Sequence, residues 1–332
     1  MKVPVSLEKI LKIIRRAYIG TRAKRGVRML NLKARIINSI QRKKLRKYSP
    51  FDYEELSQNI QYYSNDYFYE NEYYGNNVAI RNALGYDADT PIDALIEHGL
   101  HFGRFFDTRI LEYYRPKKFV TFSNYRKEVL IENGILEKNI MVVGPYIKYI
   151  ASAKWTPKNE LNFGRTLVVF YAHSIEGVNS IFDANILINE IKRIRDEMDF
   201  RNIIICMYWR DLQEKRHLLF EKEEMKIVTA GHRNDISFLS RLKSIIELAD
   251  MTMSNKIGTH VGYCISLGKP HFLFQQKVEY KGENVRKQHV FSNENENSFA
   301  LEEQEVLQAF GKYSEKITSE QLEIIHKYWG PF

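Results

Sequence analysis

Two adjacent side chains that could transfer a proton, Glu97 and His98, follow a short apolar segment at residues 94–96 and precede Gly99. An imidazole with a pKa of about 6.5 can accept a proton at neutral pH. We therefore predict His98 as the general base of a reaction that deprotonates a hydroxyl group, with Glu97 orienting it or taking its place. A histidine hydrogen-bonded within its own turn is the alternative explanation.

Small and amide side chains gather between an apolar segment at residues 251–253 and a helix predicted for residues 259–267. The first N–H groups of a helix lack intrahelical partners and lie at the positive end of its dipole. A helix that begins at the carboxyl end of a parallel strand can therefore bind phosphate. The residues predicted to contact a diphosphate here are Ser254, Asn255, Gly258, Thr259 and His260. An ordinary strand–helix crossover with a Ser or Thr cap explains the same residues.

Further candidates follow three other predicted strands, whose carboxyl ends would share one edge of a sheet. Those that could contact a nucleotide donor are His173, Ser174, Glu176, Tyr208, Arg210 and His232. Tyr208 or Trp209 could stack on the nucleotide base, although burial of Trp209 and solvation of Arg210 explain these residues equally well. Asp235 is expected only to cap the helix that follows it.

The remaining polar segments are predicted to be surface features. Residues 51–75 are rich in tyrosine and could line a sugar site, but a surface loop with part-buried rings is the preferred interpretation. Four cations that could recognise an anionic group are assigned to surface charge instead: Arg104, Arg109, Arg126 and Lys148.

Alternating strands and helices must position these residues. In the second half of the chain, the apolar segments predict strands at residues 166–171, 202–209, 226–229, 251–253 and 272–274. Helical spacing of apolar residues predicts the intervening helices at residues 183–198, 211–223, 236–249 and 259–267. Five strands joined by four crossovers predict a doubly wound parallel sheet.

The first half of the chain predicts a smaller unit of the same kind. Strands are expected at residues 94–96, 118–123 and 140–144, with a helix at residues 124–133 that Gly134 ends. The segment 151–164 contains Pro157 and several polar residues and is predicted to link the two units. A last helix is expected at about residues 318–329.

The N-terminal segment carries the basic character of the chain. Residues 1–48 hold 16 Lys and Arg and one acid, so the formal net charge of +9 leaves −6 for the rest of the chain. Amphipathic helices are predicted at residues 6–18 and 28–47. A basic amphipathic segment suits an anionic membrane surface. Two helices that only cover the N-terminal domain are the alternative. The lack of an aromatic-interleaved basic motif weighs against nucleic acid.

The combination resembles a GT-B glycosyltransferase of the kind that builds bacterial capsule or lipopolysaccharide. The resemblance covers about residues 75–330. The segments that carry it are Ile96-Glu97-His98-Gly99, residues 121–128, residues 143–146, Asn255-Lys256-Ile257-Gly258-Thr259-His260 and Leu267-Gly268-Lys269-Pro270.

The resemblance implies an α/β fold of two Rossmann-like domains facing a cleft, preceded by the basic helical segment at residues 1–48. The acceptor-side domain would span residues 49–155, and the nucleotide-sugar domain residues 156–312. Residues 313–332 would form a helix that packs back across both. The expected activity is transfer of a sugar from a nucleotide-sugar to a lipid-linked or growing polysaccharide. No cofactor and no essential metal are expected.

Composition sets the compartment. Cys206 and Cys264 lie in separate apolar segments and suggest buried thiols in a reducing environment. No apolar run is long enough to cross a bilayer, so we expect a cytoplasmic protein at the inner face of the membrane. Two other functions stay open. One is a nucleotide-sugar epimerase, or another group transferase, that uses the same cleft. The other is a non-catalytic protein that binds a membrane or nucleic acid.

Overall fold

The computed structural model describes residues 36–37, 39–41, 43–60, 66, 68–88, 90–104, 106–108, 110–111, 115–155, 161, 164–175, 177–282 and 296–332. The helix predicted at residues 6–18 lies outside this part, as does much of the one predicted at residues 28–47. In the described part of the second helix, residues 36–37, 39–41 and 43–45 are helical. No helix within these ranges is both long and apolar enough to cross a membrane.

The first half of the chain forms a three-stranded parallel sheet. Its strands are β1 (Leu95–Ile96), β2 (Phe119–Thr121) and β3 (Ile140–Val142), paired in that order. Helix α5 (Asn124–Glu132) connects β2 to β3. It begins where the sequence predicts, because the Ser123 hydroxyl accepts a hydrogen bond from the Arg126 N–H, 3.2 Å away.

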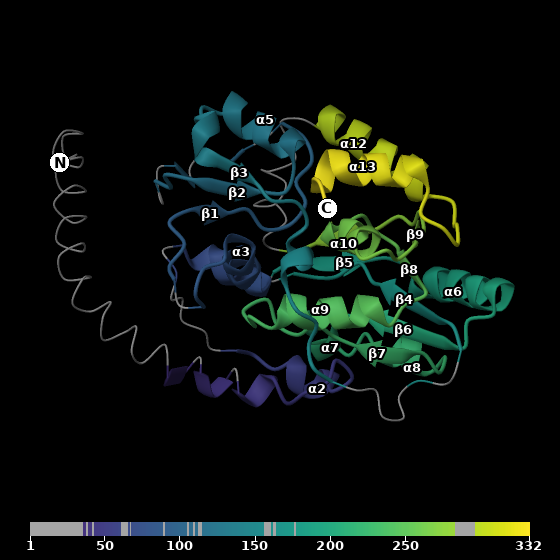
Figure 1. Cartoon of the computed structure of the whole chain (residues 1–332). Coiled ribbons are helices and arrows are strands. Elements are labelled where there is room, and N and C mark those ends of the chain that lie inside the picture. The colour runs from purple at the N-terminus through teal and green to yellow at the C-terminus, as the bar shows by residue number, and fades with distance from the viewer. Residues whose placement is uncertain are drawn as a thin grey trace, which may run out of the picture.

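The second half forms a five-stranded parallel sheet. Its strands are β4 (Thr166–Phe170), β6 (Asn202–Cys206), β7 (Lys226–Val228), β8 (Met251–Ser254) and β9 (His271–Leu273). They lie in the order β7-β6-β4-β8-β9, so the direction of winding reverses between β4 and β8 (Figure 1). Loops at such a reversal leave a crevice at the carboxyl edge of the sheet. The prediction of a mixed α/β fold with parallel sheets is confirmed.

Both faces of this larger sheet are covered. Leu167 and Val169 of β4 belong to the apolar cluster that contains α6 (Ala184–Met198). Val168 and Phe170 belong to the cluster that contains α9 (Phe238–Glu247) and part of α10 (Thr259–Ser266). Alternate residues of a strand point to opposite faces, so burial on both sides explains why the strands are continuous apolar runs.

One predicted helix is wrong. The segment 211–223 contains two short helices, α7 (Trp209–Gln213) and α8 (Leu218–Glu221), instead of one. Lys215 between them has a φ of 58°, a left-handed conformation that ends an α-helix. Helix α7 also begins earlier than the prediction, so Trp209 lies in a helix and not in the preceding strand.

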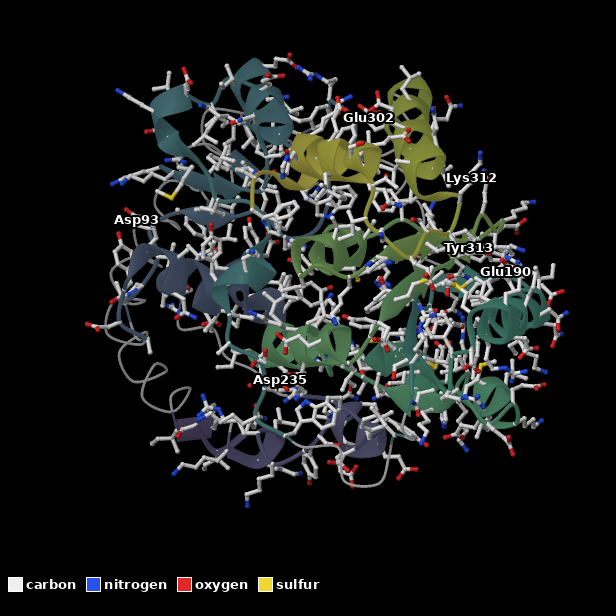
Figure 2. The ribbon with its side chains drawn as sticks, turned by 45° about the vertical axis from the view of Figure 1, so that its right-hand side comes forward. Asp93, Glu190, Asp235, Glu302, Lys312 and Tyr313 are labelled. Atoms are coloured by element: carbon white, nitrogen blue, oxygen red, sulfur yellow. The ribbon has the colours of Figure 1, made fainter. Side chains whose placement is uncertain are left out.

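The two sheets share one core. The cluster that contains Val168 and Leu239 also contains Ile96 and Val120 from the smaller sheet. Helix α13 (Ser319–Trp329) packs on α5 and on α10, so it contacts both units, and α12 (Glu296–Phe310) lies beside it (Figure 1). Glu302 of α12, labelled in Figure 2, accepts a hydrogen bond from the Tyr125 hydroxyl of α5, 2.5 Å away.

The remaining elements are short. They are α2 (Tyr53–Leu56), η1 (Tyr69–Gly75), α3 (Asn76–Leu84), η2 (Glu137–Asn139), η3 (Tyr146–Tyr149) and the antiparallel pair β5 (Asn179–Ile181) and β10 (Glu279–Lys281).

Candidate functional site

The turn after β1 meets the start of α10. The Leu100 N–H donates a hydrogen bond to the Thr259 hydroxyl, 2.9 Å away. Leu100 follows His98 by two residues, and Thr259 is the first residue of α10. The proposed base and the predicted anion-binding helix therefore lie next to each other, although 161 positions separate His98 from Thr259 in the sequence.

His98 is held as a neutral imidazole. Its side chain is half-buried, and its ring meets the Tyr73 ring edge-on at a centroid distance of 5.4 Å. Burial lowers the pKa of His98, Glu97 opposes this effect, and the positive charge of Arg233 lowers the pKa further. A neutral ring can accept a proton at neutral pH, as a general base must. His101, three residues later, is exposed.

Glu97 supports this turn through an ion pair. Its carboxylate is buried and 2.8 Å from the Arg126 guanidinium, and it accepts a 2.8 Å hydrogen bond from the Thr121 hydroxyl. Burial alone would raise its pKa, but Arg126 holds the pKa below the ordinary value. The interpretation of Arg126 as surface charge is therefore wrong. Because its oxygens already accept these bonds, the Glu97 carboxylate stabilises the turn after β1 and is poorly suited to act as a base.

Three of the residues predicted to contact a diphosphate instead hold the turn after β8 together. The Ser254 hydroxyl lies 3.0 Å from His271 Nε2 and donates to the backbone oxygen of Lys256. Asn255 accepts from the Ala172 N–H at 2.8 Å and donates to Gln276, which ties the loops after β4 and β9. The Thr259 hydroxyl accepts from Leu100. Ser254 and Asn255 are buried, and their side chains bond to neighbouring parts of the protein.

The first turn of α10 keeps the features of an anion site. Its N-cap is Gly258, so no side chain caps the first amides. The His260 ring folds back over Gly258, because a Cβ on Gly258 would lie 2.9 Å from it. It stacks on Phe170 at 4.8 Å. Burial and His173 lower the pKa of His260 to about 3. The His260 ring is therefore neutral at pH 7, and the prediction of a charged side chain here is wrong.

The loop after β4 has one accessible and one buried candidate. His173 is exposed to solvent, although the protein around its ring lowers its pKa to about 4 by desolvation. Ser174 is fully buried, and its N–H donates to the Asp211 carboxylate at 3.0 Å. Ser174 thus anchors the loop. Glu176 lies outside the described residues.

The loops after β6 and β7 place aromatic rings beside the loop after β4. The Tyr208 ring is 5.0 Å from the His173 ring, and Tyr208 hydrogen-bonds Tyr74. Trp209 is buried 4.3 Å from the His232 ring, so it is not placed to stack on a base. The His232 Nδ1 accepts from the Asn234 N–H at 3.0 Å, which leaves its proton on Nε2.

Two further candidates have mainly structural contacts. Arg210 pairs with Glu214 one helical turn away, at 3.3 Å. Asp235, labelled in Figure 2, accepts from the Ser237 N–H just before α9 and forms a buried ion pair with Arg241 at 2.6 Å. Asp235 therefore stabilises the start of α9 through Ser237 and the helix itself through Arg241.

Sequence reasoning missed the tyrosines that close one side of the site. Tyr73 contacts His98, and the Arg233 guanidinium lies 5.1 Å from the Tyr73 ring centre. Tyr74 has a φ of 60° and donates its N–H to the Arg233 oxygen at 2.6 Å. The only sign of these tyrosines in the sequence is the tyrosine-rich composition of residues 51–75, which favours a surface loop.

Asp211 was missed as well. Burial raises its pKa to about 6 although Ser174 hydrogen-bonds it. No sequence pattern marks it, because its partner Ser174 lies 37 positions earlier. Within the described residues, no group of three or more His, Cys, Asp or Glu side chains is placed to hold a metal ion.

Comparison with known proteins adds little. No protein-family model matches the chain, and no curated protein matches it. One solved structure that it resembles is described as "Crystal structure of GtfA/B complex", with 9% identity and a TM-score of 0.29. The alignment covers 70% of this chain and 52% of the other, so the chain spans about half the length of that structure. A TM-score this low carries no argument about fold or function.

Proposed function

We propose that the protein is a glycosyltransferase that moves a sugar from a nucleotide-sugar to a lipid-linked or growing surface polysaccharide, such as capsule or lipopolysaccharide. The observation that carries the proposal is the contact between Leu100 and Thr259, which sets a neutral His98 beside the uncapped start of α10. In this proposal, the units containing the two sheets are the acceptor and donor domains of a GT-B arrangement.

The reaction divides between the two units. His98 takes the proton of the acceptor hydroxyl as that oxygen attacks the anomeric carbon. The bond to the donor diphosphate breaks, and the first amides of α10 stabilise the developing charge. The neutral His260 ring stacks on Phe170 and has its Nδ1 beside Gly258, at the start of α10. The neighbouring rings of Tyr208 and His173 would contact the nucleotide. No metal or cofactor takes part.

An epimerase is less well supported by the same geometry. Proton transfer at a sugar carbon by a carboxylate needs an acid free to exchange its proton. The acid nearest to the proposed base is Glu97, whose pKa Arg126 holds low and whose oxygens accept from Arg126 and Thr121. A histidine-dependent group transfer remains the alternative among enzymes. A non-catalytic binding protein would have no use for a neutral His98 beside α10.

The basic segment is proposed to hold the enzyme at the inner face of an anionic membrane. In its described part, Ile36 and Ile40 are 53% and 63% exposed, and four exposed cations follow them: Lys43, Lys44, Arg46 and Lys47. The segment is anchored to the larger unit, because the Leu45 and Pro50 oxygens accept hydrogen bonds from Arg241 and from the Thr229 N–H. Exposed apolar residues beside cations favour an anionic bilayer over nucleic acid.

The test of the reaction begins with binding. Thermal unfolding is measured with UDP, GDP and CMP, and hydrolysis is then screened across the sugar conjugates of the nucleotide that stabilises the protein. We expect one nucleotide to raise the melting temperature and His98→Ala to cut turnover by about two to four orders of magnitude. The control His326→Ala, exposed on α13, should keep turnover. The absence of stabilisation by every nucleotide would count against the enzyme proposal.

The test of the membrane proposal is co-sedimentation with vesicles that contain anionic lipid. The variant Ile36→Glu/Ile40→Glu should lose binding, because it removes both exposed apolar residues and adds negative charge. Ile186→Glu is the matched control, since Ile186 is 50% exposed on α6. Equal binding of the two variants would refute this localisation without affecting the proposed reaction.

A further inference from the structure

Trp329 fixes the first turn of α10. Its side chain is fully buried, and its indole N–H donates a hydrogen bond to the Thr259 backbone oxygen, 3.0 Å away. The same ring lies directly on the helix, because a Cβ added to Gly262 would come within 2.2 Å of it. Any larger residue at position 262 would force the ring and the helix apart.

The next two residues close onto loops of the smaller sheet. Gly330 has a φ of 85°, and a Cβ there would lie 1.9 Å from the Phe122 backbone oxygen, just after β2. Gly144, just after β3, has a φ of 75°, and its Cβ would lie 2.1 Å from the Pro331 oxygen. Both positions need glycine for conformation and for space. The backbone of residues 330–331 therefore lies against both loops.

The turn that carries His98 contacts the same segment. The Phe102 ring packs edge-on against Tyr328 at 5.2 Å and against Trp329 at 6.3 Å. Leu100, between His98 and Phe102, donates to Thr259. The loops after β1, β2 and β3 and the first turn of α10 thus converge on residues 328–331. Figure 1 shows the C-terminal end of the chain between the smaller sheet and α10.

We propose that residues 329–331 are a positioning joint that sets the distance between His98 and the start of α10. The joint contributes no group to the reaction. Its effect on the rate rests on the proposed function, in which the smaller unit carries the base and the larger unit binds the leaving group. A shift of about 1 Å between such groups can cost about a hundredfold in rate.

The joint also controls the surroundings of His98. Arg233, which belongs to the larger unit, acts electrostatically on His98, which belongs to the smaller one. If the joint loosens, water reaches His98 and Arg233 moves relative to it. Both changes would bring the pKa of His98 back toward its ordinary value. This readout needs no substrate.

The experiment compares two glycine variants at positive φ, only one of which lies against a loop of the smaller sheet. Gly330→Ala adds a methyl group against Phe122, whereas Gly134→Ala has a φ of 88° and nothing within 4 Å of its Cβ. Histidine titration by NMR, with His98→Ala to assign the signal, gives the His98 pKa in each. We expect Gly330→Ala to raise this pKa and to lower nucleotide-sugar turnover by about ten- to a hundredfold, while Gly134→Ala changes neither.

Trp329→Phe keeps the inference testable if Gly330→Ala does not fold. It keeps an aromatic ring but removes the donor to Thr259 and part of the buried ring, so turnover should fall by at least about fivefold, the ratio that one hydrogen bond of about 1 kcal/mol provides. An unchanged His98 pKa and unchanged turnover in these folded variants would overturn the joint. A raised His98 pKa in a protein that turns over no nucleotide-sugar would support the joint while refuting the proposed function.

Discussion

The two turns that meet in the candidate site are stabilised by different chemistry. The turn after β1 depends on a buried ion pair between Glu97 and Arg126. The turn after β8 depends on neutral hydrogen bonds of Ser254, Asn255 and His271. A buried charge that loses its partner costs far more than a neutral group that loses one hydrogen bond. The first turn should therefore be more sensitive to substitution, whereas mild acid should act on both, because histidine pKa values are lowered in each.

The largest effect is expected for Arg126→Met. It leaves the Glu97 carboxylate buried without its cation, which should lower the free energy of unfolding by about 3–5 kcal/mol at neutral pH. Urea titration measures this loss. Glu97→Gln/Arg126→Met removes both charges and should recover part of it. If the single variant were as stable as the native protein, the ion pair would not hold this turn.

A smaller effect is expected for Asn255→Ala on the other turn. The change removes the acceptor of the buried Ala172 N–H and the donor to Gln276. One unsatisfied buried amide should lower the free energy of unfolding by about 1–3 kcal/mol. Asn185→Ala, at an exposed position of α6, should change it by less than about 0.5 kcal/mol. A loss larger than that of Arg126→Met would reverse the ranking of the two turns.

The sequence predicted most of the framework because its signals are local. Helices α5, α6 and α10 lie close to their predicted positions, and the Ser123 cap and the apolar stripe of α6 are patterns that span only a few residues. Parallel strands buried on both faces are continuous apolar runs, so the larger sheet could be predicted as well.

The contacts within the site could not be predicted in the same way. The partner of Arg126 lies 29 positions earlier, and only the pairing of β1 with β2 brings the two together. Tyr74 takes a positive φ because its N–H reaches Arg233 across the interface between the units. Ser254 and Asn255 have the residue types of a phosphate site, but distant loops use their hydrogen bonds. Long-range contacts, which leave no periodic pattern, decided these cases.

Mild acid should destabilise the turn after β8 through His271. Its ring is fully buried, both nitrogens lie within 3.0 Å of the Thr252 and Ser254 hydroxyls, and burial and His260 hold its pKa well below 6.5. The unfolded chain binds a proton below that pH and the folded chain does not. The contribution of His271 to the free energy of unfolding is therefore complete above pH 6.5. Below that pH it falls by up to about 1.4 kcal/mol per pH unit.

His271→Gln should flatten this dependence in urea titrations across the weakly acidic range, whereas His326→Gln, on the exposed side of α13, should not. Glu97 should affect stability only at a more acidic pH than His271. Its folded pKa lies below 4.5, so its contribution is present above that value and is lost only as pH falls through the lowered pKa. An unchanged slope in His271→Gln would place the acid sensitivity elsewhere.

The smallest effect is expected for Arg104→Met. This variant breaks an ion pair of the same residue types as Glu97 and Arg126, but at an exposed position. Arg104 and Glu132 form an ion pair in the same unit as Glu97 and Arg126, but their side chains are 39% and 52% exposed, against 6% for Arg126 and 7% for Glu97. Water and salt screen an exposed pair, so the free energy of unfolding should fall by no more than about 1 kcal/mol. Added salt should leave little of that loss. If Arg104→Met and Arg126→Met were equally destabilising, the cost at the turn after β1 would come from losing an arginine side chain and not from stranding a buried carboxylate.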